Sequence, residues 1–397
     1  MAAHSKTSYD AVVIGAGVIG LSIAWRAAES GLSVAVVERD GAGAGASGVA
    51  AGMLAPVTEA EFGEQDLLRL NMAAADAWPA FDRALRERSG ASTGYAESGS
   101  LVVAPYRDDA GELRRLHAFQ RSLGLESEWL TRTDCRRLEP ALAPGVAGGI
   151  LAPHDHQVDP RAVVGALRIG LERAGGELLC GAEVQSLEVD RERVTGVRTP
   201  AGRLRGEHVV VAAGAFSGRL PGLPLAAVPP VRPVKGQILR LGSGGKPPLV
   251  TRVVRTPRCY ILARPDGEVV IGATVEERGF DTRVTADGVY RLLQAAWEVL
   301  PDVAELELVE TAARLRPGTP DNCPIIGAGA LEGLVWATGH HRNGVLLAPL
   351  TADAIVRSLV DGDPSPAGAR FSPERFDDRS RAGAHARLPL HDVEPVR

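Results

Sequence analysis

The stretch that decides the fold is Tyr9–Pro56, which reads YDAVVIGAGVIGLSIAWRAAESGLSVAVVERDGAGAGASGVAAGMLAP. It contains the pattern Gly-x-Gly-x-x-Gly, with its glycines at Gly15, Gly17 and Gly20. In dinucleotide-binding proteins the first glycine allows a tight turn, the second lets a pyrophosphate approach the backbone, and the third lets helix pack on strand. Glu38 follows eighteen positions after Gly20, where it is placed to accept hydrogen bonds from an adenosine ribose.

The surroundings of the glycines support this interpretation. An apolar run at 12–14 predicts a strand before them, residues 21–30 predict a helix after them, and residues 33–37 predict a second strand that ends at Glu38. The alternative is a glycine-rich surface turn, which has no need of a strand, a helix and an acidic residue in this order. We therefore predict a bound dinucleotide and a Rossmann-like α/β domain.

The composition is that of an ordinary globular protein. With 397 residues, 45% hydrophobic and 23% charged, the chain is large enough for two domains. A net charge of -5 offers no electrostatic basis for binding nucleic acid, and the four cysteines form no CxxC pair that would indicate a metal site. The sequence shows neither a secretion signal nor an apolar run of transmembrane length. We expect a cytoplasmic protein that binds no metal, nucleic acid or membrane.

Later segments predict further elements. Apolar residues at helical spacing predict a long helix over 61–88, which leaves the nucleotide-binding unit. Asp159 as N-cap and Pro160 at the first helical position predict a helix that runs to about Ala174. The remaining predictions are antiparallel strands near 237–241, 260–263 and 269–273, a hairpin turn at Asp266-Gly267 and a closing helix over 349–360.

The order of these elements indicates two domains that alternate along the chain. The nucleotide-binding domain is predicted to be discontinuous, with a second, α+β domain built on a mainly antiparallel sheet inserted into it. The tail is polar and irregular and is predicted to be disordered. The predicted ranges are 1–85, 152–226 and 312–376 for the first domain, 86–151 and 227–311 for the second, and 377–397 for the tail.

A second loop of small residues favours a flavin over a nicotinamide cofactor. Residues 43–48 are followed by Ala51, Gly52 and Met53, and this run leads away from the adenosine. Small residues let the backbone lie against a pyrophosphate and an isoalloxazine edge, and Ser47 can bond a phosphate oxygen. A flexible surface loop is the alternative.

Two C-terminal motifs point to a family. They read RLRPGTPDNCPIIG at Arg314–Gly327 and ATGHHRNGVLLAP at Ala337–Pro349. With these motifs the chain, over roughly 9–376, resembles the glycine oxidases of the thiamine-biosynthesis type, within the D-amino-acid oxidase group of flavoenzymes. The resemblance implies a glutathione-reductase-type domain with noncovalently bound FAD, and a homotetramer. It also implies that glycine, sarcosine or small D-amino acids are oxidised to the imine and oxo acid, with ammonia and with hydrogen peroxide formed from dioxygen.

The resemblance also assigns residues to a site. Tyr260 and Arg316 would bind the substrate carboxylate, with Arg342 as a second pocket arginine. Val184 would contact the adenine through its backbone. The FAD would be lined by Gly15, Gly17, Val18, Ile19, Gly20, Glu38, Arg39, Ala46, Ser47, Ala51, Gly52 and Met53, and its pyrimidine ring would be approached by His340, His341, Arg342, Asn343, Gly344, Val345 and Leu346.

Elementary chemistry is consistent with these roles, although each residue has a plainer alternative. Arginine presents a planar fork of donors that pairs with a carboxylate, which fixes the α-hydrogen of an amino acid toward the flavin. The alternative for Arg316 is a surface arginine that pairs with Asp321 or Glu310. The alternative for Arg342 is a structural arginine that holds its loop by bonding carbonyl groups. Tyr260 is instead a core tyrosine if the strand buries it. For His340 and His341 we favour a role in shaping the loop.

Two positions depart from the family's pattern, and two other functions stay open. Arg258 stands where we expect a histidine, and Val275 stands where we expect a methionine, so the cavity is predicted to admit substrates larger than glycine. The first rival function is an FAD-dependent dehydrogenase of sarcosine- or proline-type amines with an acceptor other than oxygen. The second is the flavin module of a tRNA-modifying assembly, which the acidic net charge disfavours.

Overall fold

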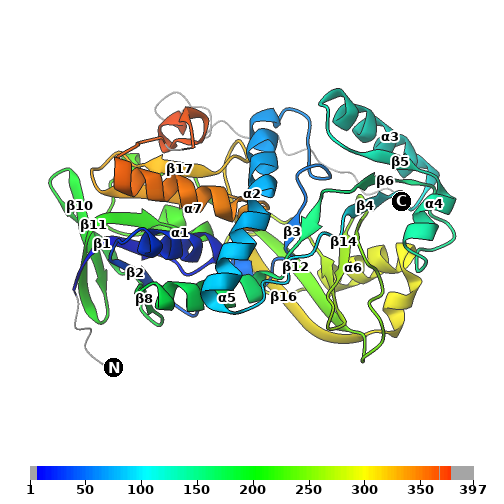
Figure 1. The fold of residues 1–397 in the computed structure, drawn as a ribbon, viewed down its shortest axis with the longest axis horizontal. Helices are drawn as coiled ribbons and strands as arrows, with labels where there is room; N and C mark the ends of the chain where they lie inside the picture. The colour runs from blue at the N-terminus through cyan, green and yellow to red at the C-terminus, as the bar shows by residue number, and fades with distance from the viewer. Residues whose placement is uncertain (1–6, 366, 377–397) are drawn as a thin grey trace.

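The computed structural model describes residues 7–365 and 367–376, so the predicted tail at 377–397 lies outside the described residues. These residues form two large β-sheets at opposite ends of an elongated molecule, with the long helix α2 (Gln65–Ser89) between them (Figure 1). A two-stranded ribbon joins β3 (Met53–Leu54) to β7 (His156–Gln157). The site must therefore be sought where the two sheets face each other.

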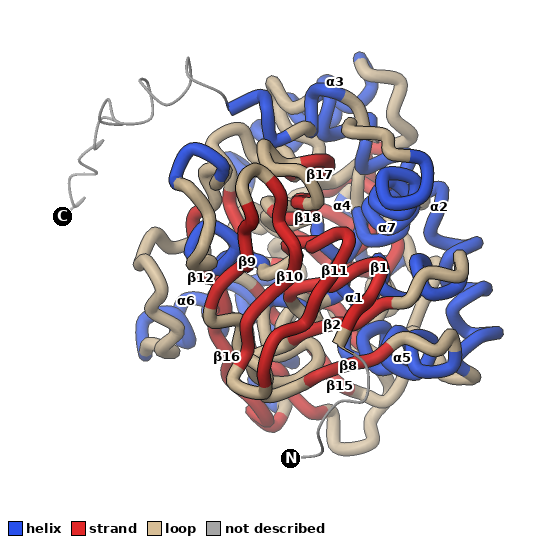
Figure 2. The backbone as a smooth tube through the Cα atoms, turned by 90° about the vertical axis from the view of Figure 1, so that its left-hand side faces the viewer, coloured by secondary structure: helices blue, strands red, loops and turns tan. Residues whose placement is uncertain are grey.

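The first sheet has the parallel centre expected of a Rossmann-like unit. β1 lies between β2 and β11 and runs parallel to both, and β17 closes one edge in the antiparallel direction. Strands β9 and β10 extend β11 as an antiparallel ribbon (Figure 2). The strand bounds are β1 (Ser8–Ile14), β2 (Val34–Val37), β8 (Glu177–Leu179), β9 (Ser186–Asp190), β10 (Arg193–Thr199), β11 (Gly202–Val211), β17 (Ile325–Ala328) and β18 (Leu334–Thr338).

Both faces of this sheet are covered, which explains why its central strands are apolar throughout. Val13 of β1 packs in a core with helices α1 (Val18–Glu29), α2, α5 (Pro160–Arg173) and α7 (Gly344–Asp361). Val12 and Ile14, which point to the other face, pack in a second core with residues of β9 and β10. The predicted cap of α5 is confirmed, because the Asp159 side chain accepts a hydrogen bond of 2.9 Å from the Arg161 N–H.

One apolar face of the second sheet packs against its helices, and the other face lies toward the first half of the molecule. Ile261 and Ile271 pack with α6 (Ala286–Val299) and α4 (Arg132–Leu138), whereas Leu262 and Val270 cluster with Ala51 and Met53. All strand pairs are antiparallel except β4 with β13. Helix α3 (Arg107–Ser122) follows β4. The strand bounds are β4 (Ser100–Val103), β5 (Glu128–Leu130), β6 (Gly149–Ala152), β12 (Arg232–Gly242), β13 (Val253–Arg255), β14 (Tyr260–Ala263), β15 (Glu268–Gly272) and β16 (Glu307–Gly318).

Three helix starts differ from the sequence-based predictions, and the first is that α2 begins at Gln65 rather than at 61. The closing helix was expected to begin at Pro349, but α7 begins five residues earlier at Gly344 and carries Pro349 inside it. Proline lacks the N–H that would bond the carbonyl four residues before it. The residues just before Pro349 are apolar and buried against α1 and α2, so packing outweighs the lost hydrogen bond. Likewise α1 begins at Val18 rather than at 21, because the third glycine of the motif is itself helical.

The division into domains stays a prediction, and one of its boundaries cuts through a strand. The predicted boundary between residues 311 and 312 falls inside β16, which pairs with β12 over its whole length, from Glu307 to Gly318. Residues 312–318 are thus part of the second sheet. Because this strand continues to the edge of the first half, it carries side chains of the second sheet toward the glycine-rich loops.

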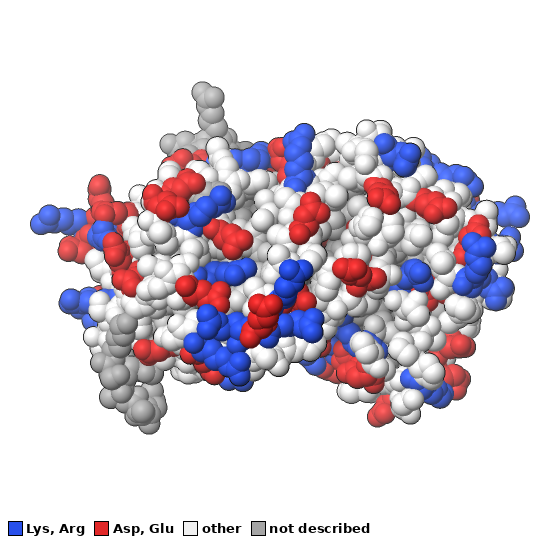
Figure 3. Space-filling view, viewed as in Figure 1, with Lys and Arg blue, Asp and Glu red and all other residues white. Residues whose placement is uncertain are grey.

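The surface is of mixed charge. Acidic and basic side chains are interspersed over the face shown in Figure 3, without a broad patch of either sign on that face. In the part of the chain that the structure describes, no helix is both long enough and apolar enough to cross a bilayer. Within the same residues, histidine, cysteine, aspartate and glutamate side chains form no group of three or more that could hold a metal ion.

Candidate active site

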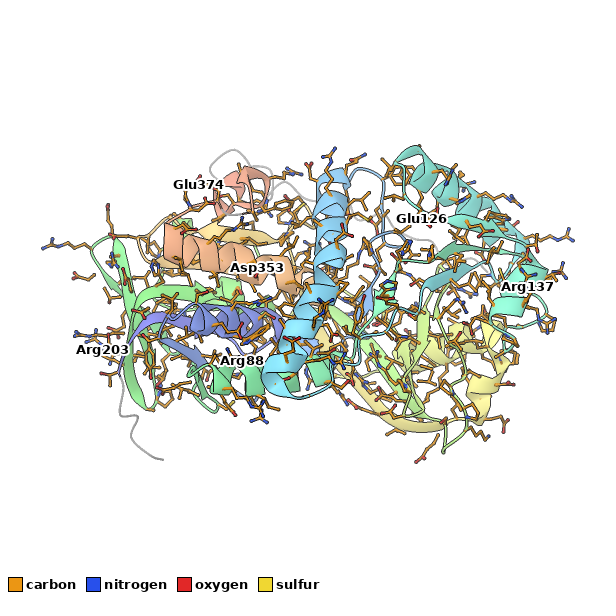
Figure 4. All side chains as sticks on the ribbon, in the orientation of Figure 1. Arg88, Glu126, Arg137, Arg203, Asp353 and Glu374 are labelled. Carbon is orange, nitrogen blue, oxygen red and sulfur yellow. The ribbon has the colours of Figure 1, made fainter. Side chains whose placement is uncertain are left out.

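A cavity of about 1530 Å³ is lined by residues of both sheets. Its lining includes Gly15 and Glu38 from the first half of the molecule, and Tyr260 and Arg316 from strands β14 and β16 of the second sheet. The charged side chains labelled in Figure 4 project from the outer surface, and none of them lines this cavity. The cavity thus joins the two regions that the sequence singled out.

At its first end, the cavity is bounded by the glycine turn. Gly15 has a φ of 104°, which favours glycine, and a Cβ added to Gly20 would lie 1.9 Å from the Gly15 carbonyl oxygen. The turn therefore closes only with glycine at position 20. The N–H of Val18 at the start of α1 donates to Ser47 Oγ over 2.9 Å. This helix start provides free amide groups and positive potential for an anionic pyrophosphate.

Glu38 is held in place where strand β2 ends. Its carboxylate accepts hydrogen bonds from the N–H of Ala16 at 2.8 Å and from the N–H of Asp40 at 2.9 Å. A carboxylate has about four acceptor positions, so both oxygens retain capacity for ribose hydroxyl groups. Arg39 pairs with Asp40 at 3.0 Å and lines the same end of the cavity, as does Val184.

The second small-residue loop is fixed by three arginines from other elements. Arg314 Nε donates to the Ala44 carbonyl at 2.9 Å, and Arg161 Nε donates to the Gly48 carbonyl at 2.7 Å. The buried Arg264 donates to the Ala51 carbonyl. A flexible surface loop would not need such ties. A tight glycine turn, a free helix start and an anchored loop along one cavity fit an extended dinucleotide such as FAD.

The two predicted substrate residues lie against glycines of neighbouring strands. A Cβ added to Gly236 of β12 would lie 2.4 Å from Arg316 Nη1, and a Cβ added to Gly272 of β15 would lie 2.2 Å from the Tyr260 hydroxyl oxygen. Glycine at both positions therefore leaves the space in which these side chains lie across the sheet. Arg316 donates to the Thr274 carbonyl at 3.1 Å, which fixes its direction.

Arg316 keeps its charge available. The two carboxylates suspected as its partners are engaged elsewhere, since Asp321 pairs with Arg375 at 2.9 Å and Glu310 pairs with Arg161 at 2.7 Å. Among the described residues, no carboxylate forms an ion pair with Arg316. Burial lowers the pKa of Arg316, but a guanidinium still remains charged near neutral pH. Burial also raises the pKa of Tyr260, so its hydroxyl group stays a donor.

Arg342 also lines the cavity, but its charge is compensated. It forms ion pairs with Glu61 at 2.6 Å, with Glu59 at 3.5 Å and with Glu64 at 3.6 Å, and it donates to the Glu59 carbonyl at 3.4 Å. The last contact matches the alternative that Arg342 holds its loop. Its role as a second substrate arginine stays a prediction, and it differs from Arg316 in charge balance.

The adjacent histidines are both held neutral. His340 is buried with Nε2 at 3.0 Å from Thr351 Oγ1, and burial lowers its pKa to about 3. The His341 N–H donates to the Pro317 carbonyl at 2.9 Å, which ties the loop to β16. Burial, followed by the charges of Arg316 and Arg342, lowers the pKa of His341 to about 4. These contacts connect the loop to its surroundings, in line with a role in shaping it.

Three of the predicted cofactor residues lie behind the wall of the cavity, and the others line it. Gly20 packs on the glycine turn, and Asn343 precedes α7, where its carbonyl accepts from the Leu347 N–H at 2.8 Å. The Leu346 carbonyl accepts from Trp78 Nε1 at 2.9 Å, which ties α7 to α2. Gly344 and Val345 do line the cavity, so the first turn of α7 opens onto it.

The positions that depart from the family's pattern leave the substrate end open. The Val275 side chain lines the cavity but is 72% exposed, so it closes little of the space. Arg258 also lines the cavity, and its charge is compensated by an ion pair with Glu298. Cys323 is buried outside the cavity lining, and burial raises its pKa to about 11, which does not suit a covalent link to a flavin.

Sequence reasoning missed three residues of the site. Gly236 and Gly272 had a detectable signal, because a glycine inside an alternating strand marks a close approach of another group. Glu59 had none, because it lies in the polar run TEAEFGE, which reads as an ordinary surface segment. In the structure its side chain is only 10% exposed and lines the cavity beside Arg342.

The glycine turn can be tested by adding one methyl group. We predict that Gly20→Ala weakens FAD binding by about 100-fold or more, because the new Cβ would collide with the Gly15 carbonyl and open the turn. Gly41→Ala is the matched control, since a Cβ there meets no atom within 4 Å. Fluorescence titration of the apoprotein with FAD measures both affinities. Wild-type affinity in the Gly20→Ala protein would contradict this description.

The neutral state of His340 predicts a dependence of stability on pH. The unfolded chain takes up a proton near pH 6.5 and the folded protein only near pH 3, so this group lowers stability as pH falls from 6.5 toward 3. His340→Gln should reduce the stability lost between pH 8 and pH 5 by about 2 kcal/mol in urea unfolding. His154→Gln, at a histidine 67% exposed, should leave that loss unchanged. Equal losses in wild type and His340→Gln would refute the assignment.

Comparison with known proteins places the chain in a family. A family profile described as FAD dependent oxidoreductase matches residues 10–358. The glycine oxidase of Geobacillus kaustophilus (strain HTA426) is 35% identical, over 89% of this chain and 93% of that protein. The crystal structure of glycine oxidase from Geobacillus kaustophilus gives a TM-score of 0.87 at 34% identity, over 93% of this chain and 99% of that one.

Bifunctional proteins are also similar to this chain. The "Bifunctional protein ThiO/ThiG" of Synechocystis sp. is 35% identical over 94% of this chain, which spans only 54% of that protein. The chain therefore covers about half the length of these bifunctional relatives, and nearly the full length of the glycine oxidase. From the profile match, the extent of these similarities and the cavity geometry, we conclude that this chain belongs to the family of FAD dependent oxidoreductases.

Proposed function

We propose that this protein is an FAD-dependent oxidase of glycine and other small amino acids, including sarcosine and small D-amino acids. The observation that carries the proposal is Arg316, a guanidinium without a carboxylate partner, which lines the same cavity as the glycine turn. The relative from Geobacillus kaustophilus, 93% of whose length is covered by the alignment with this chain, is named glycine oxidase. The products are the imine or its oxo acid, ammonia and hydrogen peroxide.

The residues of the chain act mainly by orientation. Arg316 and the Tyr260 hydroxyl group bind the carboxylate of the amino acid, which leaves its α-carbon and amine directed along the cavity. FAD, when bound, would supply the redox chemistry as the acceptor of a hydride from the substrate. The first turn of α7 lines the cavity at Gly344 and Val345, and the backbone N–H groups of this helix start would stabilise negative charge there. Water would then hydrolyse the imine to the oxo acid and ammonia, and the two electrons and two protons removed from the amino acid would reduce dioxygen to hydrogen peroxide.

A place in thiamine thiazole synthesis is part of the proposal. The names of two kinds of relative support it: the bifunctional ThiO/ThiG of Synechocystis, and a "Putative thiamine biosynthesis oxidoreductase ThiO" of Rhizobium etli, which is 36% identical over 88% of this chain. Dioxygen as acceptor, a cytoplasmic location and a homotetramer remain predictions from the sequence.

The two rival functions are less well supported. An L-proline dehydrogenase from P. horikoshii matches with a TM-score of 0.79, but at 21% identity this likeness concerns the fold alone. The absence of peroxide during turnover of an amino acid would favour such a dehydrogenase. A tRNA-modifying role is disfavoured by the net charge of -5. A gel shift with tRNA at physiological salt would revive it.

The proposed role of Arg316 gives a direct test by substitution. Arg316→Leu should lower kcat/KM for glycine and sarcosine by about 100- to 1000-fold, because the carboxylate loses its charged partner in a partly buried site. FAD content should not change, since the hydrogen bonds of Arg316 go to the carbonyl groups of Lys235 and Thr274 and not to the glycine turn. Peroxide formation and flavin absorbance measure the two quantities.

The control for this test is Arg291→Leu, which removes an arginine that is 72% exposed on α6. It should leave both the turnover of amino acids and the FAD content at wild-type levels. Amino-acid turnover that survives in Arg316→Leu would show that the substrate binds elsewhere.

A further inference from the structure

A second, smaller cavity adjoins the substrate end of the first. It has a volume of about 400 Å³ and shares three lining residues with the main cavity, namely Glu59, Arg255 and Arg342. Residues that line two cavities form the partition between them. This partition therefore consists of one carboxylate and two guanidinium groups.

The carboxylate of Glu59 engages both arginines of the partition. One oxygen lies 2.8 Å from Arg255 Nη1, and the other lies 3.5 Å from Arg342 Nε. The Glu59 side chain is 10% exposed, compared with 21% for Arg255 and 28% for Arg342. Because ion pairs shielded from water are stronger than exposed ones, Arg255 is held by its hydrogen-bonded contact with Glu59, and Arg342 receives part of its compensation there in addition to its closer pair with Glu61 at 2.6 Å.

The backbone that carries Glu59 is fixed just before it. The N–H groups of Val57 and Thr58 donate to the two carboxylate oxygens of the buried Asp155, at 3.0 Å and 2.8 Å. Glu59 thus occupies its position through the main chain as well as through its ion pairs. It is a built part of the cavity wall.

The remaining charges make the substrate end unusual. Arg255 and Arg342 are compensated by Glu59, with Glu61 and Glu64 as further partners of Arg342, and Arg258 is compensated by Glu298. Arg316 is the one arginine of this group of four without a carboxylate. A ligand at this end therefore meets one free guanidinium, although four arginines surround it.

We propose that Glu59 is a specificity-determining residue that restricts the enzyme to substrates with a single carboxylate. By occupying Arg255 and Arg342, it removes the two cations that a second anionic group of the substrate would need, and its own charge repels such a group. The inference rests on the proposed function, in which Arg316 binds the substrate carboxylate. It names the substrate class as monocarboxylic amino acids.

The test is the isosteric substitution Glu59→Gln in the FAD-bound protein. Sarcosine and iminodiacetate differ in that the second replaces the N-methyl group of the first by N-carboxymethyl, so their ratio of kcat/KM reports acceptance of a second carboxylate. We expect Glu59→Gln to shift this ratio at least about tenfold toward iminodiacetate. Glu59→Asp, which keeps the charge but draws it back from Arg255, should shift the ratio less, in the same direction.

Glu61→Gln is the matched control. It removes the same charge from Arg342, but Glu61 lines only the smaller cavity and its side chain is 51% exposed. In Glu61→Gln, the ratio of kcat/KM for iminodiacetate to that for sarcosine should stay within about threefold of wild type. An unchanged ratio in Glu59→Gln, or an equal shift in Glu61→Gln, would overturn the proposal.

Binding without turnover separates this inference from the proposed function. Acetate and malonate carry one and two carboxylates, and their dissociation constants are measured through changes in the flavin absorbance. Glu59→Gln should favour malonate over acetate by about tenfold relative to wild type. If the wild-type protein oxidises no amino acid, the proposed function fails, whereas this ratio of dissociation constants still supports or overturns the role of Glu59.

Discussion

The constraint on which the site depends is that Arg316 lies against a strand face with two glycines and without a carboxylate partner. Gly236 leaves the space for its guanidinium group, and Gly272 leaves the space for the neighbouring Tyr260. The carbonyl of Thr274 fixes the direction of Arg316 without cancelling its charge. Glu59 acts on this charge but forms no ion pair with it. A partly buried cation without an ion-pair partner is costly, so the cavity is electrostatically prepared for a carboxylate.

The remainder of the fold brings the cofactor loops to that cation. β16 is an edge strand of the second sheet and extends from Glu307 to Gly318. Within it, Arg314 donates a hydrogen bond to the Ala44 carbonyl of the small-residue loop. The His341 N–H bonds the Pro317 carbonyl, so the loop before α7 is joined to the same strand. One strand therefore positions the substrate arginine, a cofactor loop and a helix start together, and the distance between them is set by backbone geometry.

The sequence carries more information about the cofactor end of the cavity than about its substrate end, for physical reasons. The glycine turn is local, since Gly15, Gly20 and Glu38 lie within one strand, helix and strand, and spacing alone relates them. The prediction for the start of α7 is wrong because Pro349 is a local boundary signal, whereas packing against α1 and α2 decides where the helix begins. Arg316 and Tyr260 came from family resemblance, and their roles remain predictions. Glu59 was missed because its partners Arg255 and Arg342 are distant in sequence, so its burial depends on tertiary structure.

The most direct test of this account is a crystal structure of the FAD-bound protein with glycolate, a carboxylate that resembles glycine but lacks the amine. We expect the carboxylate of glycolate to lie within hydrogen-bond distance of the Arg316 guanidinium and of the Tyr260 hydroxyl group, with Arg255 and Arg342 still paired to Glu59. A glycolate bound instead to Arg342 or Arg255, with Arg316 unoccupied, would contradict it.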